Sequence, residues 1–380
     1  MNVQPAVGEA EIAQLVMIRS LVTLMVCVAA VTAATPVQAG SCRPEGSESF
    51  LCGEGKEALR VFADTVSPSK KFAFAWRSST GLLQRDGLPG GDIENHLVRL
   101  EDGRVLAEAS STAGMGSLRP EDFEPMLLDL IIDWIDVARA TDVLACGMVG
   151  ARQGWAEAGY VTVPGAPSGP LTRAPSRDAG IAVHILPGMR QLSPPDLMRG
   201  EETQIAGLLV REPGFDGVVC LPGTHTKWAH VSAGEVVSFT SYMTGELFAL
   251  LAGQSVLRHT VGREGWSDAD FAEAVQDAMA RPERVSSRLF GLRAEAILSD
   301  LSPERSRARL SGLLIGAELA GARSYWLGRD LAMIGASRLV DAYGVALGLV
   351  GQTARRLDAA EMTLAGLTAA RAAMIAGRRR

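Results

Sequence analysis

The sequence predicts an α/β fold of two lobes with a cleft between them. Paired strand patterns are followed by helical patterns twice along the chain, which is the order expected for that architecture. The chain has 380 residues, of which 47% are hydrophobic, and a single core rarely grows beyond roughly 250–300 residues. No repeat of solenoid period occurs. The length and the pattern together therefore indicate two core-forming units.

The first lobe is predicted over residues 96–180. The runs HLVRL and VLAEAS, joined by EDGR, indicate two strands of a hairpin. The segment EPMLLDLIIDWIDVAR (124–139) places apolar side chains at helical spacing. DVLACGMVG (142–150) indicates a strand that runs into a glycine loop. These elements make up only a partial N-terminal lobe.

The second lobe is predicted over residues 181–380. It opens with the strand and turn IAVHILPG, and MRGEETQIAGLLV (198–210) indicates a helix with carboxylates at its start. Residues 217–251 predict a strand, a loop, two strands joined by a turn, a second loop and a helix.

The remainder of that lobe is predicted to be mainly helical. Helical spacing dominates residues 267–326, and LAMIGAS (331–337) is an apolar strand followed by a helix from about Leu339.

Residues 1–40 have the layout of a secretory signal. An apolar run over residues 21–34 precedes Val37 and Ala39, which are small residues at the −3 and −1 positions of a cleavage site. The run is too short for a comfortable transmembrane helix, so no stable membrane span is expected. A buried core helix is the alternative interpretation. If the signal is real, the true start of the protein is Met17.

Residues 41–95 are expected to be unrelated to the two lobes or poorly ordered. They contain Gly, Ser, Pro and charged residues with short apolar stretches such as FAFAW. Cys42 and Cys52 could form a disulfide in an oxidising compartment. Cys146 and Cys220 end apolar runs and are predicted to be buried thiols. Cysteine and histidine show no metal-ligand spacing, so no metal ligands are assigned.

The segment LPGTHTKW (221–228) has the composition of an anion-binding loop. A turn needs Gly or Pro for its dihedral angles, but it does not need hydroxyls and a cation. Gly223 allows close approach of the backbone, the amides and hydroxyls of Thr224 and Thr226 could donate to phosphate oxygens, and Lys227 supplies positive charge. A strand-to-strand turn with solvated polar residues is the alternative.

Two neighbouring carboxylates, Glu201 and Glu202, stand at the start of a predicted helix. Carboxylates in a first turn are favoured by the helix dipole, which is the structural interpretation. The functional interpretation is a general base that takes a proton from a sugar hydroxyl as it attacks a phosphoryl group.

Two further stretches combine small and polar residues. In SYMTGELFALL, Thr244 is predicted to cap the following helix, and Gly245 leaves room for a ligand near the helix start. In MIGAS, a strand leads to Gly335, Ala336 and Ser337. Such an end suits the close approach of a nucleotide base or ribose, and it suits tight strand–helix packing equally well.

These motifs resemble those of the 2-dehydro-3-deoxygalactonokinases, which belong to the sugar-kinase branch of the actin-like ATPase superfamily. The stretches that match, in family order, are LACGMVGARQGW, ILPG, MRGEETQIAG, LPGTHTKWAHV, SYMTGELFALL, SGLLIGAEL and IGAS. They span roughly residues 97–375. The resemblance implies a two-lobed actin-like ATPase (ribonuclease H-like) fold. It also implies transfer of the γ-phosphate of ATP, with Mg²⁺, to the 6-hydroxyl of 2-dehydro-3-deoxy-D-galactonate in D-galactonate catabolism.

The resemblance also implies a role for each motif. The second phosphate-binding loop corresponds to Gly223, Thr224, His225, Thr226 and Lys227. The catalytic carboxylate corresponds to Glu201, with Glu202 beside it. The adenosine motif corresponds to Gly335, Ala336 and Ser337. The sugar acid is expected to face Gly147, Met148, Arg152, Arg199, Thr244, Gly245 and Glu246, and Arg152 or Arg199 could pair with its carboxylate.

The first phosphate-binding motif of the family, a strand carrying Asp-Trp-Gly-Thr-Thr, is missing. The nearest imitation is FAFAWRSST (72–80), which has Ala75 in place of the Asp and Arg77 in place of the Gly. Without the carboxylate the metal loses a fixed partner. Residues 75–80 are therefore given no catalytic role, and the N-terminal lobe is predicted to be incomplete.

Two explanations of this departure are open. Either the chain joins part of a small secreted protein (about residues 17–95) to a truncated kinase, or a relative of the kinases has become a catalytically impaired sugar-acid-binding protein. The signal-like residues 17–39 indicate export, whereas an ATP-dependent kinase is expected in the cytoplasm because the periplasm lacks ATP. The expected partners are the sugar acid and ATP. A net charge of −6 indicates no nucleic-acid partner, and a homodimer stays open.

Overall fold

The computed structural model describes eight stretches of the chain, namely residues 42–44, 49–52, 59–62, 71–76, 95–101, 104–111, 118–135 and 140–378. The chain divides into two compact units between Pro68 and Ser69. The described part of the first unit is an antiparallel sheet of three strands, β1 (Cys42–Pro44), β2 (Ser49–Cys52) and β3 (Leu59–Phe62), in that order. Its register sets Cys42 opposite Cys52, and their disulfide stays a prediction. The predicted signal segment lies outside the described residues.

The first described strand of the second unit contains FAFAW, the segment that most resembles the missing first strand of the family. β4 (Lys71–Trp76) pairs antiparallel with β5 (Asn95–Glu101), which pairs with β6 (Arg104–Ser111). The predicted hairpin of β5 and β6 is confirmed. On its other side β4 lies beside β7 (Thr141–Ala145). The segment FAFAW therefore stands between the hairpin and the next strand of the N-terminal lobe.

The helix predicted over residues 124–139 is shorter than expected. α2 (Phe123–Ile131) buries Phe123, Leu127 and Ile131 against strand residues such as Val143, and a single 3₁₀ turn, Ile132–Trp134, follows it. The β-branched pair Ile131–Ile132 has low helix propensity, which is consistent with an end at this point. Residues 136–139 lie outside the described part.

Sheet pairing continues across the lobe boundary expected at residue 181. β10 (Ile181–Ile185) pairs parallel with β7 and antiparallel with β9 (Thr172–Arg173). β11 (Gly188–Leu192) pairs with β8 (Tyr160–Thr162) and β12 (Pro195–Met198). The apolar run IAVHI thus completes the first lobe, as a strand buried on both faces of a parallel pair does. β11 and β12, by contrast, contribute Met189 and Met198 to the core that also contains Val219, so they pack with the second lobe.

A five-stranded sheet forms the centre of the second lobe, in the order β15-β14-β13-β16-β17. Its strands are β13 (Gly217–Leu221), β14 (Thr226–Ser232), β15 (Glu235–Tyr242), β16 (Leu331–Gly335) and β17 (Arg355–Asp358). β13 to β15 form an antiparallel meander, and β16 joins β13 in parallel. The predicted succession of strands and turns over residues 217–251 is confirmed, with Gly234 at φ 79° in the turn.

Alternate residues of β13 pack into two different cores. Val218 and Cys220 face a core built with α5 (Asp268–Ala280), α7 (Pro303–Gly321) and α9 (Ser337–Gly348). Val219 and Leu221 face a core built with α3 (Glu201–Arg211) and α10 (Ala359–Arg378). The sheet is therefore covered by helices on both faces, which explains why its central strand is a continuous apolar run.

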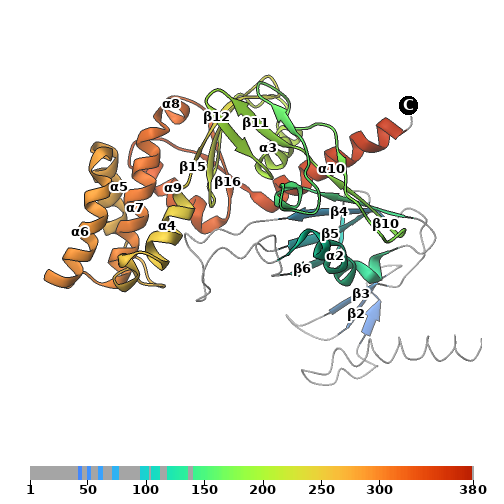
Figure 1. Cartoon of the computed structure of the whole chain (residues 1–380), viewed down its shortest axis with the longest axis horizontal. Helices are drawn as coiled ribbons and strands as arrows, with labels where there is room; N and C mark the ends of the chain where they lie inside the picture. The colour runs from blue at the N-terminus through green and yellow to red at the C-terminus, as the bar shows by residue number, and fades with distance from the viewer. Residues whose placement is uncertain are drawn as a thin grey trace, which may run out of the picture. The chain divides into compact units, whose positions relative to one another are not determined.

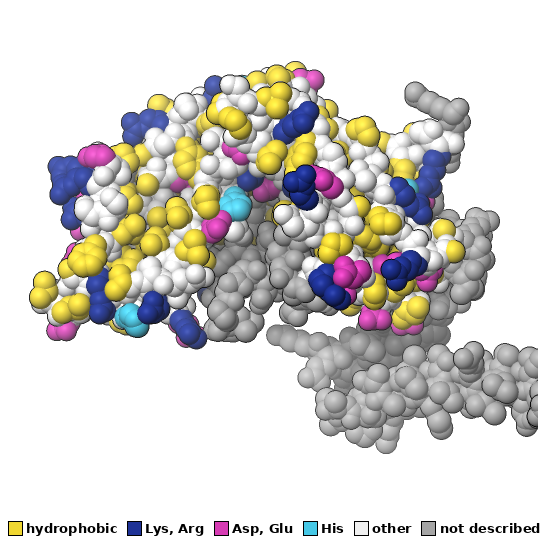
Figure 2. Space-filling model, in the orientation of Figure 1, with side chains coloured by type: hydrophobic (Ala, Val, Ile, Leu, Met, Phe, Trp, Pro, Cys, Tyr) yellow, Lys and Arg dark blue, Asp and Glu magenta, His cyan; other side chains and the backbone are white. Residues whose placement is uncertain are grey.

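Helices supply most of the remaining chain, as predicted for residues 267–326. They include α4 (Thr244–Gly253), α6 (Val285–Leu298) and α8 (Arg323–Trp326). Figure 1 shows α5, α6 and α7 side by side, and α7 is in contact with both α5 and α6. Cys146 and Cys220 are buried thiols, as predicted. In the described part of the chain, no helix is long and apolar enough to cross a membrane. Figure 2 shows basic and acidic side chains interspersed over the visible face.

Candidate active site

The two predicted carboxylates lie in the first turn of α3, which begins three residues later than expected. Met198 still belongs to β12, and Gly200 has φ 111°. That left-handed backbone suits glycine and separates the strand from the helix. A side chain on Gly200 would meet the Cα atom of Gly147 at 3.3 Å, so the GMVG loop and the start of α3 touch through glycine backbone.

Glu201 and Glu202 have different surroundings. Glu202 is buried, and its carboxylate accepts a hydrogen bond from the Gly200 N–H at 2.7 Å. Burial, with the charge of Glu201 beside it, raises the pKa of Glu202 to about 8. Glu201 is a quarter exposed, and its Oε1 lies 3.9 Å from the Nζ atom of Lys227. Of the two, Glu201 is therefore the carboxylate that faces the anion-binding loop.

Residues 222–225 form the turn of that loop (221–228) between β13 and β14. Two predicted segments pack directly against this turn. A side chain on Gly245, in the first turn of α4, would lie 2.4 Å from the carbonyl oxygen of Gly223. The Glu246 N–H donates to the carbonyl of Thr224 at 3.0 Å. On the opposite side, a side chain on Gly335 would meet the carbonyl of Pro222 at 3.4 Å. The structure thus brings the loop, the MTGE segment and the IGAS segment together.

Two threonines point away from the roles expected of their side chains. Thr226 is fully buried, and its hydroxyl lies 2.9 Å from the hydroxyl of Tyr343 rather than at the loop surface. Thr244 was expected to cap α4, but the N-cap residue is Met243 and no side chain caps the helix. The Thr244 hydroxyl instead donates to Glu318. Both hydroxyls are drawn inward because a buried carboxylate attracts donors.

His225 and Glu246 form a pair at the surface of the loop. The His225 Nε2 lies 2.5 Å from the Glu246 Oε2, and both side chains are more than a third exposed. Glu246 was expected to face the sugar acid. The structure joins it to a residue of the anion-binding loop instead.

Two arginines were expected on the sugar-acid side. Arg199 is held by surrounding protein groups, whereas Arg152 is mostly exposed. The Arg199 guanidinium lies 4.3 Å from the centroid of the Tyr160 ring and donates to the carbonyl of Ala158 at 2.7 Å. Its Nε and Nη1 atoms are buried without a hydrogen-bond partner in the described residues. Arg152 has a side chain 82% exposed, with Glu157 at 3.8 Å.

Gly150 makes room for Arg199. A side chain at Gly150 would meet the Nη1 atom of Arg199 at 2.9 Å. The GMVG loop therefore contributes space, through Gly150 and Gly147, rather than side chains. Met148 is half-buried at the start of the same 3₁₀ turn.

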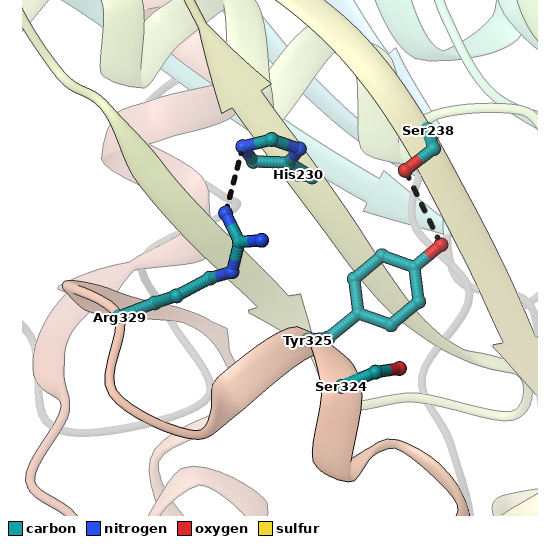
Figure 3. Close-up of a pocket in the computed structure, with 5 residues that line it drawn as sticks. All are labelled: His230, Ser238, Ser324, Tyr325 and Arg329. Atoms are coloured by element: carbon teal, nitrogen blue, oxygen red, sulfur yellow. Dashed lines mark hydrogen bonds between the residues drawn. The ribbon is translucent and has the colours of Figure 1, made fainter.

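A separate pocket of about 250 Å³ holds none of the predicted site residues. Figure 3 shows its lining, in which the Arg329 guanidinium lies 3.0 Å from the His230 ring nitrogen and the Tyr325 hydroxyl points at Ser238. It lies toward the far end of β14 from the anion-binding loop, since His230 is near the end of that strand.

Sequence reasoning missed Glu318 in α7. The SGLLIGAEL stretch was recognised, yet no role was given to its carboxylate. A single acidic residue within an apolar helical run was the available signal, because such a residue needs buried hydrogen-bond donors.

The chain has the two-lobed α/β fold of the actin-like ATPases and sugar kinases, with Lys227 at 3.9 Å from the Glu201 carboxylate. A solved structure described as a 2-dehydro-3-deoxygalactonokinase protein from Sinorhizobium meliloti superposes with a TM-score of 0.70 at 34% identity, covering 80% of this chain and 96% of that one. The 2-keto-3-deoxy-galactonokinase family matches residues 92–370. The chain belongs to this family, which confirms the predicted resemblance and makes the protein a phosphotransferase.

Two curated relatives agree with this assignment. A protein of Rhizobium meliloti (strain 1021), described as a 2-dehydro-3-deoxygalactonokinase, is 38% identical over 71% of this chain and 90% of its own length. The 2-dehydro-3-deoxygalactonokinase of Escherichia coli (strain K12) is 33% identical over 58% of this chain and 74% of its own length.

Proposed function

We propose that the protein transfers the γ-phosphoryl group of ATP to the 6-hydroxyl of 2-dehydro-3-deoxy-D-galactonate. The names of its relatives supply the substrate class. The observation that best supports a reaction at this site is the contact of 3.9 Å between Lys227 and Glu201. Lys227, which would bind the phosphate, lies next to Glu201, which would accept the proton of the attacking hydroxyl. Such an adjacency is what phosphoryl transfer to an alcohol requires.

In the proposed mechanism Glu201 is the general base. Its carboxylate accepts the proton of the sugar hydroxyl while that oxygen bonds to phosphorus and the bond to the leaving nucleotide breaks. The backbone N–H of Arg199 donates to Glu201 Oε2 at 3.0 Å and fixes its direction. Glu202 is unsuited to the task, because a pKa raised to about 8 leaves it protonated at neutral pH.

Lys227 provides positive charge for the transferred phosphoryl group. Lys227 is buried, so its charge acts in a medium that screens it less than water does. Glu246, with its Oε2 at 2.5 Å from the His225 Nε2, orients the imidazole. Carbonyl groups of the loop are held by α4, which leaves the loop backbone pre-positioned for phosphate oxygens.

Arg199 is proposed to bind the carboxylate of the sugar acid. Two of its nitrogen atoms lack partners in the described residues, and a guanidinium matches a carboxylate with two parallel hydrogen bonds. The nucleotide base and ribose are placed at Gly335, Ala336 and Ser337, next to Pro222. Dependence on ATP favours the cytoplasm as the place of action.

The described residues hold no preformed cage for a metal ion, but Mg²⁺ bound to nucleotide phosphates needs only one or two protein carboxylates. Within those residues, no group of three or more His, Cys, Asp and Glu side chains is close enough to hold a metal ion. Bound Mg²⁺ would offset charge on the phosphates.

A catalytically impaired relative is the second candidate, and the sequence at β4 favours it. The segment FAFAWRSST, which includes part of β4, is the nearest imitation of the family's Asp-Trp-Gly-Thr-Thr strand, with Ala75 in place of the Asp and Arg77 in place of the Gly. An assay that couples ADP release to oxidation of NADH, run on the native chain and on an Ala75→Asp/Arg77→Gly variant, separates the candidates. Turnover in both supports the kinase, and turnover in the variant alone supports the impaired relative. Binding of ATP and sugar acid without turnover in either would refute the proposed reaction.

A further inference from the structure

Glu318 stands at the centre of a buried group of hydrogen bonds behind the anion-binding loop. It lies in α7 with only 2% of its surface exposed. Its Oε1 accepts from the indole N–H of Trp228 at 2.8 Å. Its Oε2 accepts from the hydroxyls of Tyr343, at 2.7 Å, and Thr244. One carboxylate therefore joins side chains from β14, α4 and α9.

The direction of the hydrogen bonds extends this group to Thr226. Tyr343 has one hydroxyl proton and donates it to Glu318, so the contact of 2.9 Å between Thr226 and Tyr343 has Thr226 as donor. Thr226 is the neighbour of Lys227, and Thr244 is the neighbour of Gly245. The carboxylate thus holds both segments that shape the anion-binding loop from the interior side.

We infer that Glu318 is a positioning residue, which sets the start of β14 and the start of α4 relative to each other and so fixes the anion-binding loop between them. The inference rests on the proposed function only in taking this loop to bind the phosphates of ATP. The contacts themselves are independent of it. Glu318 touches neither substrate in this account and acts through Thr226, Thr244 and Tyr343.

A carboxylate suits this position better than any isosteric group. Burial raises the pKa of Glu318 to about 7, and the hydrogen bonds from Thr244, Tyr343 and Trp228 oppose that rise. A glutamine would have the same shape but only one oxygen. Its amide NH₂ cannot face the indole N–H, which only donates, so it would face the two hydroxyls. Both hydroxyls would then have to turn from donors into acceptors, and the charge-assisted hydrogen bonds that hold the two segments would be lost.

Two variants and a control test the inference by hydrogen exchange and by kinetics. Glu318→Gln disturbs both segments, whereas Tyr343→Phe keeps the ring and removes the hydroxyl that links Glu318 to Thr226. The hydrogen bonds of Glu318 with Trp228 and Thr244 remain in Tyr343→Phe. Ser306→Ala is the matched control, because Ser306 is a fully buried hydroxyl of the same helix that has no hydrogen-bond partner in the described residues.

In Glu318→Gln, amides of residues 222–228 and 243–248 are expected to exchange about 10-fold faster, and those of β10 at the native rate. In Tyr343→Phe, only residues 222–228 should respond. The KM for ATP is expected to rise roughly 10-fold in both variants, with the KM for the sugar acid unchanged, since loop displacement affects the phosphate side. Ser306→Ala should behave as the native chain.

Unchanged exchange at both segments in Glu318→Gln would overturn the inference, and so would a uniform rise that includes β10, because that pattern reports general destabilisation. The exchange measurement needs no turnover. If the native chain transfers no phosphoryl group while the local exchange pattern appears as expected, the proposed function fails and the positioning role of Glu318 stands.

Discussion

Replacing Gly245 with alanine is expected to displace the anion-binding loop without unfolding the protein. The added Cβ atom would lie 2.4 Å from the Gly223 carbonyl oxygen and 2.8 Å from the Cα atom of Thr224. The first distance is about 1 Å short of ordinary van der Waals contact. Both neighbours are backbone atoms, so the strain cannot be relieved by rotating a side chain. The loop or the start of α4 must therefore move by about that distance.

A misplacement of about 1 Å in a catalytic arrangement lowers rates by about 100-fold. We therefore expect Gly245→Ala to lose about 100-fold in kcat/KM for ATP, measured by the coupled assay in whichever of the native and Ala75→Asp/Arg77→Gly backgrounds turns over. Gly253→Ala is the control, because Gly253 ends the same helix and its added Cβ atom would meet nothing within 4 Å. Alanine there should change unfolding stability by at most about 1 kcal/mol. Native kcat/KM in Gly245→Ala, with intact folding, would refute the reasoning.

Three further expectations follow from the same contacts. In a background that turns over, Glu201→Gln should keep sugar-acid binding and lose about 10²- to 10⁴-fold in kcat, the usual contribution of a general base. If Glu202→Gln showed that loss and Glu201→Gln did not, Glu202 would be the general base. Gly207→Ala should lower the free energy of unfolding, measured by denaturant titration, by about 1–3 kcal/mol. The reason is that the added Cβ atom would lie 1.9 Å from the carbonyl oxygen of Met362, where α3 crosses α10. Gly214→Ala is the control and should have little effect, because its Cβ atom would meet nothing within 4 Å. Stability should fall as pH rises from about 5 to 8, because the pKa values of Glu318 and Glu202 are raised to about 7 and 8 in the folded state. The unfolded chain loses these protons first, so each group lowers the free energy of unfolding by up to about 1.4 kcal/mol per pH unit. A flat profile, or the same slope in Glu202→Gln, would contradict this expectation.

The sequence predicted the succession of strands and turns over residues 217–251 well because its signals are local. The apolar run of β13, the glycine at the following turn and the alternation in β14 and β15 each depend on adjacent residues. The proximity of Glu201 to Lys227 also followed, since the motif order places both at one end of the sheet. Family resemblance then supplied roles that local patterns cannot.

Long-range contacts account for what the sequence did not predict. The partners of Glu318 lie 25 to 90 residues away along the chain, so no local pattern relates them. The start of α3 was misplaced because β12 pairs with β11 up to Met198, and that tertiary pairing overrides the helical periodicity. The continuation of the first lobe to β10 was likewise set by pairing with β7, forty residues earlier.

The site formed by Glu201 and Lys227 is proposed to transfer a phosphoryl group from ATP to a sugar acid. The most direct test is ³¹P nuclear magnetic resonance of a mixture of the native chain, ATP, Mg²⁺ and 2-dehydro-3-deoxy-D-galactonate. The account predicts a new phosphomonoester signal coupled to the two protons on carbon 6, growing as the γ-phosphate signal of ATP declines, and strongly reduced in Lys227→Met. A signal of free inorganic phosphate alone, or a phosphomonoester that forms equally fast in Lys227→Met, would contradict it.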